Sequence, residues 1–375
     1  MSFVPSDHDH PLRLAGPLWV TAAAIRHRFF SLRSRRKPDH PARILIAHQL
    51  LLGDAFMLTP LLAKLRHRYP AAEIVLACPW AQAPLYASRP YGVLAWPYDA
   101  RGRGSIENLL TQAAASGGFD LALIPGENRY AWFAAACGAR WIVALAGGAA
   151  YKNWPLDEIR PWPPQLEPLP DVFASLIDGE APPAYSTQDW AAPAHQPFTQ
   201  PATPYCVLHV GASNPNKLWP PAHWLRLATE LHERGYHIIW SGGRHETALV
   251  NACDPSGRFA SMAGQLDLAQ MWQLIANAAL LVAPDTGMAH LGRLVATPTI
   301  AIFGPGLTRL VGGDFWRNQP FQVVVLDDMT ARYQLTLFKR SLPWLHDHEA
   351  ARLTGAIYGR GFQPVRDAAL HFLSR

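Results

Sequence analysis

The chain of 375 residues is longer than one hydrophobic core usually organises, so we expect two domains. Its four cysteines stand far apart without a CxxC pair, which argues against a zinc ribbon or a disulfide framework and favours a reducing cytoplasm. The formal net charge is +5, but no long basic run follows Lys37, so anionic small molecules or lipid head groups fit better than nucleic acid.

Residues 1–42 are predicted to be an N-terminal extension with a basic amphipathic helix. At helical spacing, one apolar stripe contains Leu18, Ala22, Ile25, Phe29 and Leu32. Arg26 and Arg33 flank this stripe, as in a helix that lies on an anionic membrane surface, here between residues 16 and 37. A helix docked on its own protein would show the same pattern, so both interpretations stay open.

The same extension carries no signal for export. Its charges follow the apolar residues instead of preceding them, and the apolar part is too short to span a bilayer. We therefore expect a cytoplasmic protein that is peripheral on the inner face of the cytoplasmic membrane if the stripe binds lipid. Asp7-His8-Asp9 looks like a metal motif but lies in a polar tail before any strand, so we expect no metal site.

Short apolar runs alternate with helical patterns from Arg43 onwards, and this rhythm predicts a parallel, doubly wound sheet over residues 43–190. The expected elements are a strand at 43–47, a helix at 54–69, the strand EIVLAC, a helix near 106–115 and the strand DLALIP. From Trp154 to Pro204 prolines become dense, and proline neither continues helices nor donates to sheets. We expect one short helix near 172–177 and a linker at 191–204.

A second strand and helix domain is predicted over residues 205–340. Its elements are the strand YCVLHVG, a helix at 221–234, the strand HIIWSGG, a helix near Glu246, a helix at 268–278 and the strand ALLVAP. Beyond Pro320 the pattern loosens, and the helical runs DHEAARLTGAIYG and DAALHFLSR follow. We expect these helices, within 341–375, to pack back toward the N-terminal domain.

The stretch LLVAPDTGMAHLGRLVATPTIAIFGP, residues 280–305, contains the most informative loop. Ligands of open α/β sheets bind beyond the carboxyl ends of the strands, where loops lead into helices. A helix that begins near Thr286 would point free N–H groups of Thr286, Gly287 and Met288 at an anion such as phosphate, with His290 one turn further on. Alternatively, Asp285 is only an N-cap and His290 only a core histidine.

Two more loops of the second domain carry polar residues at the equivalent position. HVGASNPNKLWP offers Ser213 and Lys217, and a lysine beside a phosphate site would neutralise a leaving diphosphate without a metal. SGGRHE places Gly243 where a ligand can approach and Glu246 where it could accept hydrogen bonds from ribose or sugar hydroxyls. The simpler interpretations are an exposed loop lysine and a glutamate favoured by any first helical turn.

In the first domain, HQLLLGDAFMLTP places Gly53 and Asp54 at the start of a helix. An aspartate there, facing a cleft between the domains, suits the deprotonation of an attacking hydroxyl. If Asp54 is only an N-cap, the base has to be sought at His48 or Glu127. Neither GxGxxG after the first strand nor a Walker motif occurs, which disfavours a dinucleotide oxidoreductase or a P-loop enzyme.

Together these loops resemble the glycosyltransferase family 9 heptosyltransferases, which attach heptose to the inner core of bacterial lipopolysaccharide. The resemblance is carried by GD-x-x-x-x-TP, K-x-WP and D-[ST]-G-x-x-H-L, within segments that cover most of 43–305. It implies a GT-B fold, two Rossmann-like domains facing a cleft, with the acceptor on the N-terminal side. The extension before Arg43 and the tail beyond Pro320 match no family pattern.

By similarity, the reaction would be inverting transfer of heptose from ADP-heptose to a hydroxyl of lipopolysaccharide core or a related glycan, with Asp54 as general base and no metal or cofactor. The partners would be a nucleotide sugar, a glycolipid or glycan acceptor and, through 16–37, an anionic membrane surface. The donor set would be Ser213, Lys217, Gly243, Glu246, Leu266, Asp285, Thr286, Gly287 and His290, and the acceptor side Gly53, Thr59, Glu127 and Arg129. A GT-B-like nucleotide-sugar epimerase and a non-catalytic nucleotide-sugar-binding homologue remain alternatives.

Overall fold

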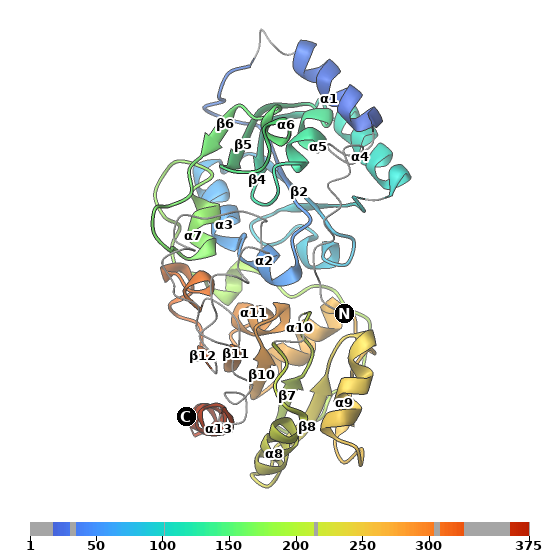
Figure 1. Ribbon diagram of the computed structural model, residues 1–375, viewed down its shortest axis with the longest axis vertical. Coiled ribbons are helices and arrows are strands. Elements are labelled where there is room, and N and C mark those ends of the chain that lie inside the picture. Colours follow the sequence, from blue (N-terminus) through green and yellow to red (C-terminus); the bar gives the residue numbers. More distant parts are fainter. Residues whose placement is uncertain are drawn as a thin grey trace. The chain divides into compact units, whose positions relative to one another are not determined.

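The computed structural model describes residues 18–30, 35–100, 102–213, 217–303, 308–325 and 361–374. Among these, 18–183 form an N-terminal unit, and 184–325 together with 361–374 form a C-terminal unit (Figure 1). The division falls before the expected boundary at 190, because Tyr185 and Trp190 are buried in the C-terminal unit. The Tyr185 hydroxyl donates a 2.9 Å hydrogen bond to the Leu294 carbonyl, and Trp190 packs on Trp272.

The N-terminal unit is built on a six-stranded parallel sheet in the order β3-β2-β1-β4-β5-β6. The central strand β1 pairs on both sides, with Ile44 opposite Ile74 and Leu121, and its buried aliphatic side chains suit a strand covered on both faces. The strands are β1 Arg43–Ala47, β2 Glu73–Cys78, β3 Leu94–Pro97, β4 Phe119–Ile124, β5 Ala139–Leu145 and β6 Glu158–Arg160. The three strands predicted in this domain therefore exist where the sequence placed them.

The helix predicted over 54–69 is two helices, α2 Leu52–Phe56 and α3 Thr59–Arg68. Pro60 lacks the N–H that would continue the helix by bonding the Phe56 carbonyl. The Thr59 hydroxyl donates to that carbonyl instead, at 2.6 Å. Proline thus fixes the break, and threonine satisfies the acceptor that the break exposes.

The other helices of the unit are α1 Leu18–Phe30, α4 Arg103–Ala115, α5 Tyr130–Ala136, α6 Ala150–Asn153 and α7 Leu169–Ala174, with a 3-10 turn at Ala83–Tyr86. Part of the proline-rich stretch belongs to this unit, because β6 extends the sheet beside β5 and α7 packs on α3. Lys64 of α3 donates to the carbonyls of Ala174 and Ile177 at the end of α7. The short helix expected at 172–177 is thus α7, which begins three residues earlier.

Helix α1 docks on its own unit, packing against α5 (Figure 1). Val20, Ala24 and Arg28 form the buried face, and Arg28 pairs with the Asp157 carboxylate at 2.9 Å. The predicted apolar stripe faces the other way: Leu18, Ile25 and Phe29 are 80%, 46% and 69% exposed. Leu32 and Arg33 lie outside the described residues, as does Asp7-His8-Asp9. Of the helices described, none is both long and apolar enough to cross a membrane.

The C-terminal unit repeats the architecture with a parallel sheet in the order β12-β11-β10-β7-β8-β9. Its strands are β7 Tyr205–His209, β8 His237–Ser241, β9 Ala260–Ser261, β10 Leu280–Pro284, β11 Thr299–Phe303 and β12 Phe321–Val325. Its helices are α8 Pro221–His232, α9 Thr247–Cys253, α10 Leu268–Ala276, α11 Gly287–Leu294 and α13 Phe362–Leu373, with 3-10 turns at Thr187–Asp189, Arg244–Glu246, Thr308–Val311 and Asp314–Trp316. The prediction of two doubly wound parallel-sheet domains is confirmed.

The last helix, α13, corrects an expectation. It contacts β10, β11 and β12, and Phe362 stacks on Trp219 in the core of the C-terminal unit. The described part of 341–375 thus packs on its own domain, because Phe362, Val365 and Ala369 form an apolar face that this core buries. The helical run predicted at 347–359 lies outside the described residues.

Candidate functional site

Each sheet has one point where the strand order reverses, and the predicted loops lie at these two points. In the C-terminal unit, β7 and β10 are neighbours whose connections leave in opposite directions along the sheet, as β1 and β4 do in the N-terminal unit. Ligands of doubly wound sheets bind at such switch points, beyond the carboxyl ends of the strands. The loop after β7 carries Lys217, the loop after β10 carries Asp285, and the loop after β1 leads to Asp54.

The structure brings Lys217 and Asp285 together. Lys217 Nζ lies 2.5 Å from Asp285 Oδ2 and donates to the Asp285 carbonyl oxygen at 3.2 Å. Both side chains are only partly buried. The interpretation of Lys217 as a solvated loop lysine is therefore wrong: the ammonium is held at the switch point.

The N-terminus of α11 lies directly after Asp285. Thr286 is the N-cap residue, with extended backbone and no capping bond from its side chain, so the alternative that Asp285 is the N-cap is wrong. The first amides of a helix lack intrahelical acceptors and carry partial positive charge. The buried Thr286 hydroxyl makes no hydrogen bond within the described residues. This end of α11 therefore offers N–H groups and a hydroxyl to an anion.

His290 lies one turn into α11 and is 5% exposed. Its Nδ1 is 3.2 Å from Arg293 Nη2, and its Nε2 is 4.0 Å from Asp285 Oδ1. Burial lowers the pKa of His290 well below its ordinary value, and the charges of Arg293 and Lys217 act in the same direction. The ring is therefore neutral at neutral pH, and its Nε2 faces the Lys217–Asp285 pair.

The loops after β7 and β8 meet at Gly211 and Glu246. Glu246 Oε2 accepts a 2.5 Å hydrogen bond from the Gly243 N–H. The carboxylate lies so close to the Gly211 Cα that a β-carbon at residue 211 would overlap it. Glycine at 211 is therefore required to admit Glu246. Glu246 is the last residue of the 3-10 turn that precedes α9. It therefore lies in a first helical turn, as predicted.

Two other residues predicted in the donor site, Ser213 and Leu266, make no hydrogen bond to the Lys217–Asp285 pair within the described part of the chain. Ser213 is exposed and Leu266 half-buried. Gly287 opens α11, where its N–H is one of the free donors. The structure thus gathers Lys217, Asp285, Thr286, Gly287 and His290 at one point, and Gly243 with Glu246 at a second.

In the N-terminal unit, α2 begins at Leu52 with Leu51 as N-cap, so Asp54 is the third residue of the helix and not its cap. The alternative that Asp54 is only an N-cap is wrong. Gly53 and Asp54 are both half-buried, in the helix that follows the carboxyl end of β1. Capping of α2 therefore does not explain the Asp54 carboxylate, and a role in catalysis stays a prediction.

The other residues predicted on the acceptor side differ in exposure. Thr59 is fully buried with its hydroxyl on the Phe56 carbonyl, so it supports the break between α2 and α3 instead of facing a ligand. Glu127 and Arg129 follow β4 and form an ion pair of 2.6 Å. This loop adjoins the loop after β1, since a β-carbon on Gly126 would lie 3.2 Å from Leu50 Cδ2.

His48 does not fit the role of an alternative base. Burial lowers the pKa of the His48 imidazole to about 3. Its Nδ1 accepts a hydrogen bond from the Leu50 N–H, so in the neutral ring the proton sits on Nε2. Neither nitrogen is then free to accept a proton from an acceptor hydroxyl.

With this geometry established, the comparisons with known proteins identify the family. A sequence model of glycosyltransferase family 9 (heptosyltransferase) matches residues 110–319, which is more than half of the chain. The chain belongs to glycosyltransferase family 9.

Curated relatives of this family 9 chain are named as heptosyltransferases. Lipopolysaccharide heptosyltransferase 1 of Pseudomonas aeruginosa is 32% identical over 143 residues, covering 37% of this chain and 39% of the relative. Lipopolysaccharide heptosyltransferase 2 of Escherichia coli is 25% identical over 300 residues, covering 70% and 83%. The match to the type 1 enzymes of Pseudomonas and Salmonella thus spans less than half of their length.

Solved structures show the same fold. The glycosyl transferase family 9 protein from Veillonella parvula superposes with a TM-score of 0.67 at 16% identity, over 91% of this chain and 99% of that one. The E. coli ADP-heptose lipopolysaccharide heptosyltransferase II gives 0.64 at 19% identity, over 88% and 98%. The predicted GT-B fold class, built from two Rossmann-like parallel-sheet domains, is confirmed.

Two residues at the site of this family 9 member escaped the sequence analysis. Gly211 was not predicted as a site residue, although a glycine just after a strand signals a close approach. Arg293 was not predicted either, since it stands in the apolar run LGRLVA. Its position three residues after His290, on the buried face of α11, is the signal that could have identified it.

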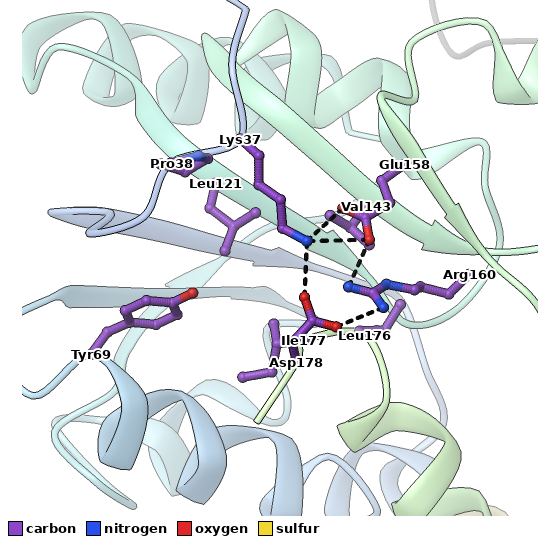
Figure 2. Close-up of a pocket in the computed structure, with 10 residues that line it drawn as sticks. All are labelled: Lys37, Pro38, Tyr69, Leu121, Val143, Glu158, Arg160, Leu176, Ile177 and Asp178. Carbon is purple, nitrogen blue, oxygen red and sulfur yellow. Dashed lines mark hydrogen bonds and ion pairs between the residues drawn. The ribbon is translucent and has the colours of Figure 1, made fainter. Parts of the chain in front are cut away.

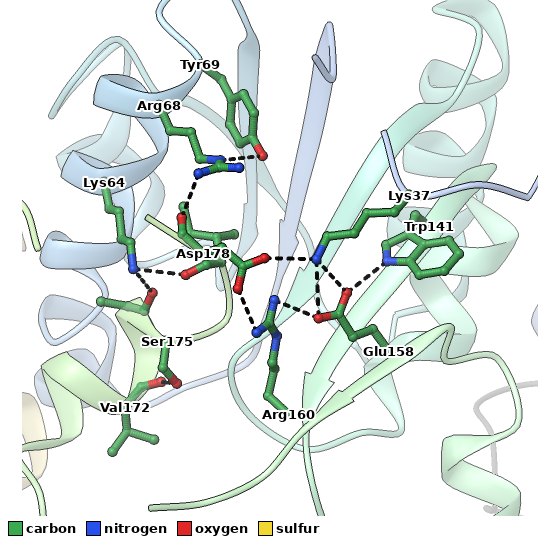
Figure 3. Close-up of polar contacts among 12 residues, drawn as sticks. Lys37, Lys64, Arg68, Tyr69, Trp141, Glu158, Arg160, Val172, Ser175 and Asp178 are labelled. Atoms are coloured by element: carbon green, nitrogen blue, oxygen red, sulfur yellow. Dashed lines mark hydrogen bonds and ion pairs between the residues drawn. The ribbon is translucent and has the colours of Figure 1, made fainter. Parts of the chain in front are cut away.

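A polar cluster of the N-terminal unit lies apart from the predicted loops. Lys37, Glu158, Arg160 and Asp178 surround a small pocket (Figure 2). Lys37 pairs with Glu158 and Asp178, and Arg160 pairs with the same two carboxylates (Figure 3). Lys37 precedes β1 and Glu158 opens β6, so the cluster lies toward the amino-terminal edge of the sheet, away from the switch point. We interpret this cluster as structural, since its ion pairs join the segment before β1, the strand β6 and the segment after α7.

No group of three or more His, Cys, Asp or Glu side chains in the described ranges could hold a metal ion.

Proposed function

We propose that this family 9 member is an inverting glycosyltransferase that moves heptose from ADP-heptose to a hydroxyl of lipopolysaccharide core or a related bacterial glycan. The observation that supports this most is the Lys217–Asp285 pair at the N-terminus of α11. It combines a held cation, free backbone N–H groups and a buried hydroxyl, which together suit a diphosphate. The names of the relatives support heptose and lipopolysaccharide.

The donor site acts through electrostatics. When the bond between the anomeric carbon and the diphosphate breaks, negative charge develops on the departing oxygen. Lys217, which Asp285 holds at the switch point, and the free N–H groups at the start of α11 would stabilise this charge. Glu246 accepts hydrogen bonds from the ribose or sugar hydroxyls, while Ser213, Gly243 and Leu266 border the same ligand. We therefore propose that transfer requires no metal.

On the acceptor side, Asp54 is the general base. The acceptor oxygen attacks the anomeric carbon, its proton passes to the Asp54 carboxylate, and the nucleoside diphosphate leaves with the bonding electron pair. Attack opposite the leaving group inverts the anomeric centre. Support for Asp54 comes from its place beyond β1 at the switch point and from the unsuitability of His48.

The decisive experiment incubates the purified chain with a panel of nucleotide sugars, with and without lipopolysaccharide core acceptors. We expect product only when ADP-heptose and an acceptor are both present. Sugar conversion without an acceptor would establish the epimerase alternative. Binding of ADP-heptose without any conversion would establish the non-catalytic homologue. Thermal stabilisation by ADP but not by UDP or GDP is the first check.

We further propose that α1 holds the protein on an anionic membrane, on the cytoplasmic side where a lipid-linked acceptor is made. The helix is anchored to its own unit through Arg28 and Asp157, which leaves Leu18, Ile25 and Phe29 exposed along one side. Arg26 is exposed on α1 and follows Ile25 directly in the chain. Apolar side chains bordered by arginine suit an anionic lipid surface.

The test uses substitutions that keep the docked face intact. A variant with Ile25→Ser and Phe29→Ser should lose binding to phosphatidylglycerol vesicles and keep its thermal stability and ADP affinity. Ile159→Ser is the matched control, because Ile159 is similarly exposed at 49% but lies on β6. Unchanged vesicle binding by the double variant would refute the membrane proposal and leave the transferase proposal intact.

A further inference from the structure

Arg293 is a buried cation beside the proposed donor site. It is 2% exposed, and its guanidinium carbon lies 4.4 Å from the centroid of the Trp316 ring and 4.7 Å from that of the Phe321 ring. Nη1 donates to the Val311 carbonyl at 2.5 Å. Nη2 lies 3.2 Å from His290 Nδ1. The contacts with the two rings and with the Val311 carbonyl hold the guanidinium in place, and its contact with His290 is held with it.

The direction of that contact determines where the imidazole carries its proton. A guanidinium has only donors, so in the Arg293–His290 bond the Nδ1 atom of the ring must accept. A neutral imidazole that accepts at Nδ1 carries its hydrogen on Nε2. We propose that Arg293 is a positioning residue that locks His290 as the Nε2–H tautomer, and so makes Nε2 a permanent hydrogen-bond donor toward the diphosphate of a nucleoside diphosphate.

The surrounding charges exclude the other protonation states. Burial and the charges of Arg293 and Lys217 lower the pKa of His290, which keeps the ring from becoming an imidazolium. Burial lowers the pKa of Arg293 to about 9, so the guanidinium remains mostly charged at neutral pH. Asp285 is the carboxylate that faces the ring, and it does not reverse this direction. Since Nε2 already carries a proton, His290 cannot act as a base.

The donor points to a place where an anion would bind. Nε2 and Asp285 Oδ1 are 4.0 Å apart, which is beyond hydrogen-bond range, so this carboxylate does not consume the donor. The Thr286 hydroxyl and the first amides of α11 lie within one helical turn of His290. A diphosphate oxygen at this helix end would receive the Nε2 hydrogen bond together with theirs. This last step rests on the proposed function, whereas the tautomer itself does not.

The tautomer is tested by long-range proton–nitrogen NMR on the full chain labelled with 15N-histidine. The His290 signals are assigned by their loss in His290→Gln. We expect Nε2 to carry the proton, Nδ1 to show the shift of an unprotonated nitrogen, and neither to titrate between about pH 6 and 8. In Arg293→Met the proton should redistribute onto Nδ1. A proton on Nδ1, or an imidazolium, in the unsubstituted protein would overturn the inference.

The role of the donor is tested by ADP affinity. His290→Ala should weaken ADP binding about 10-fold or more, the loss expected for one hydrogen bond to a charged ligand. His290→Gln should lose less, because the glutamine amide can place an N–H near the position of Nε2 without ever titrating. Arg293→Lys, which keeps a cationic donor, should bind ADP better than Arg293→Met. Thermal unfolding identifies any variant that fails only because it is unfolded.

Two outcomes separate this inference from the proposed function. If the unsubstituted protein binds no ADP, the proposed function fails while the NMR result still decides the tautomer. If His290→Gln keeps its ADP affinity but loses turnover completely, His290 transfers a proton and the inference is wrong.

Discussion

Lys217 Nζ lies 2.5 Å from the Asp285 carboxylate and 3.2 Å from the carbonyl oxygen of the same residue. The two residues come from loops that follow neighbouring strands, β7 and β10, although 68 positions separate them in the chain. A lysine held at two points loses little further freedom when an anion arrives. Partly exposed ion pairs stabilise a fold little, so the pair contributes little to stability, and its role in the proposed donor site is tested through the ligand.

Lys217→Met should weaken ADP binding and reduce kcat/KM about 100- to 1000-fold, because the departing diphosphate loses its main cation. Isothermal titration with ADP and initial rates at several donor concentrations measure both effects. Lys37→Met is the matched control, since it also removes an ion-paired lysine but from the cluster near the amino-terminal edge of the other unit's sheet. An equal loss in both variants would show that the effect is not specific to the donor site.

Metal removal should leave turnover unchanged. The proposed charge stabilisation comes from Lys217 and the N-terminus of α11, so transfer measured after dialysis against EDTA should match the untreated rate. Restoration of a lost rate by added Mg²⁺ or Mn²⁺ would contradict the electrostatic account, even if the nucleotide still bound.

Much of the fold was readable from the sequence, because buried parallel strands leave uninterrupted apolar runs. β1 has its predicted bounds, and β2 coincides with EIVLAC. β6 was missed because its three residues, Glu158 to Arg160, are polar at both ends and stand in proline-rich sequence. The prediction of one helix at 54–69 was wrong, because Pro60 lacks the N–H that would continue the helix from α2 into α3.

The site was predictable in its parts but not in its contacts. The spacing of strand, loop and helix placed Lys217 and Asp285 at the carboxyl ends of strands, which is why they could be predicted. Arg293 was not predicted because it stands in the apolar run LGRLVA, and its bond to His290, three residues earlier on α11, depends on both side chains lying on the buried face of the helix. In α1 the predicted stripe residues Leu18, Ile25 and Phe29 are exposed, whereas the docked face includes the charged Arg28, which its pairing with Asp157 makes tolerable.

The polar cluster of Lys37, Glu158, Arg160 and Asp178 should make the free energy of unfolding depend on pH. Hydrogen bonds from Arg160 and Lys37 hold the pKa of the Asp178 carboxyl well below its usual range. A carboxyl whose folded pKa is depressed stabilises the fold above its unfolded value of about 3.9, and this contribution disappears as the pH falls further. Asp178→Asn should therefore lower the urea midpoint at about pH 7 and flatten its decline below about pH 4. Because the side chain is half exposed, we expect a small effect.

If the urea midpoints of Asp178→Asn and of the unsubstituted protein declined in parallel as the pH falls, Asp178 would make no pH-dependent contribution to stability. Arg103→Gln provides the control for general surface electrostatics, since Arg103 and Glu107 form an exposed pair within α4.

Asp54→Asn tests the proposed base. Asp54 occupies the third position of α2 and does not cap it, so asparagine there should leave the thermal midpoint nearly unchanged. An amide cannot accept the acceptor's proton, and loss of a general base typically costs about 10²- to 10⁴-fold in rate. We expect kcat to fall by that factor while ADP affinity stays near normal, because the proposed phosphate site belongs to the C-terminal unit. Rates with lipopolysaccharide core acceptors and ADP titrations on the same preparation measure the two quantities.

The same experiment decides what would replace Asp54. Near-full transfer by Asp54→Asn would move the search to Glu127, which follows β4 at the switch point beside the β1 loop. Its carboxylate is held by Arg129 at 2.6 Å, so it would first have to leave that pair, and Glu127→Gln should then abolish transfer. His48 would remain unsuitable in either case, since its Nδ1 already accepts the Leu50 N–H and burial lowers its pKa to about 3. A large loss in Asp54→Asn and a small one in Glu127→Gln is the combination that assigns the base to Asp54.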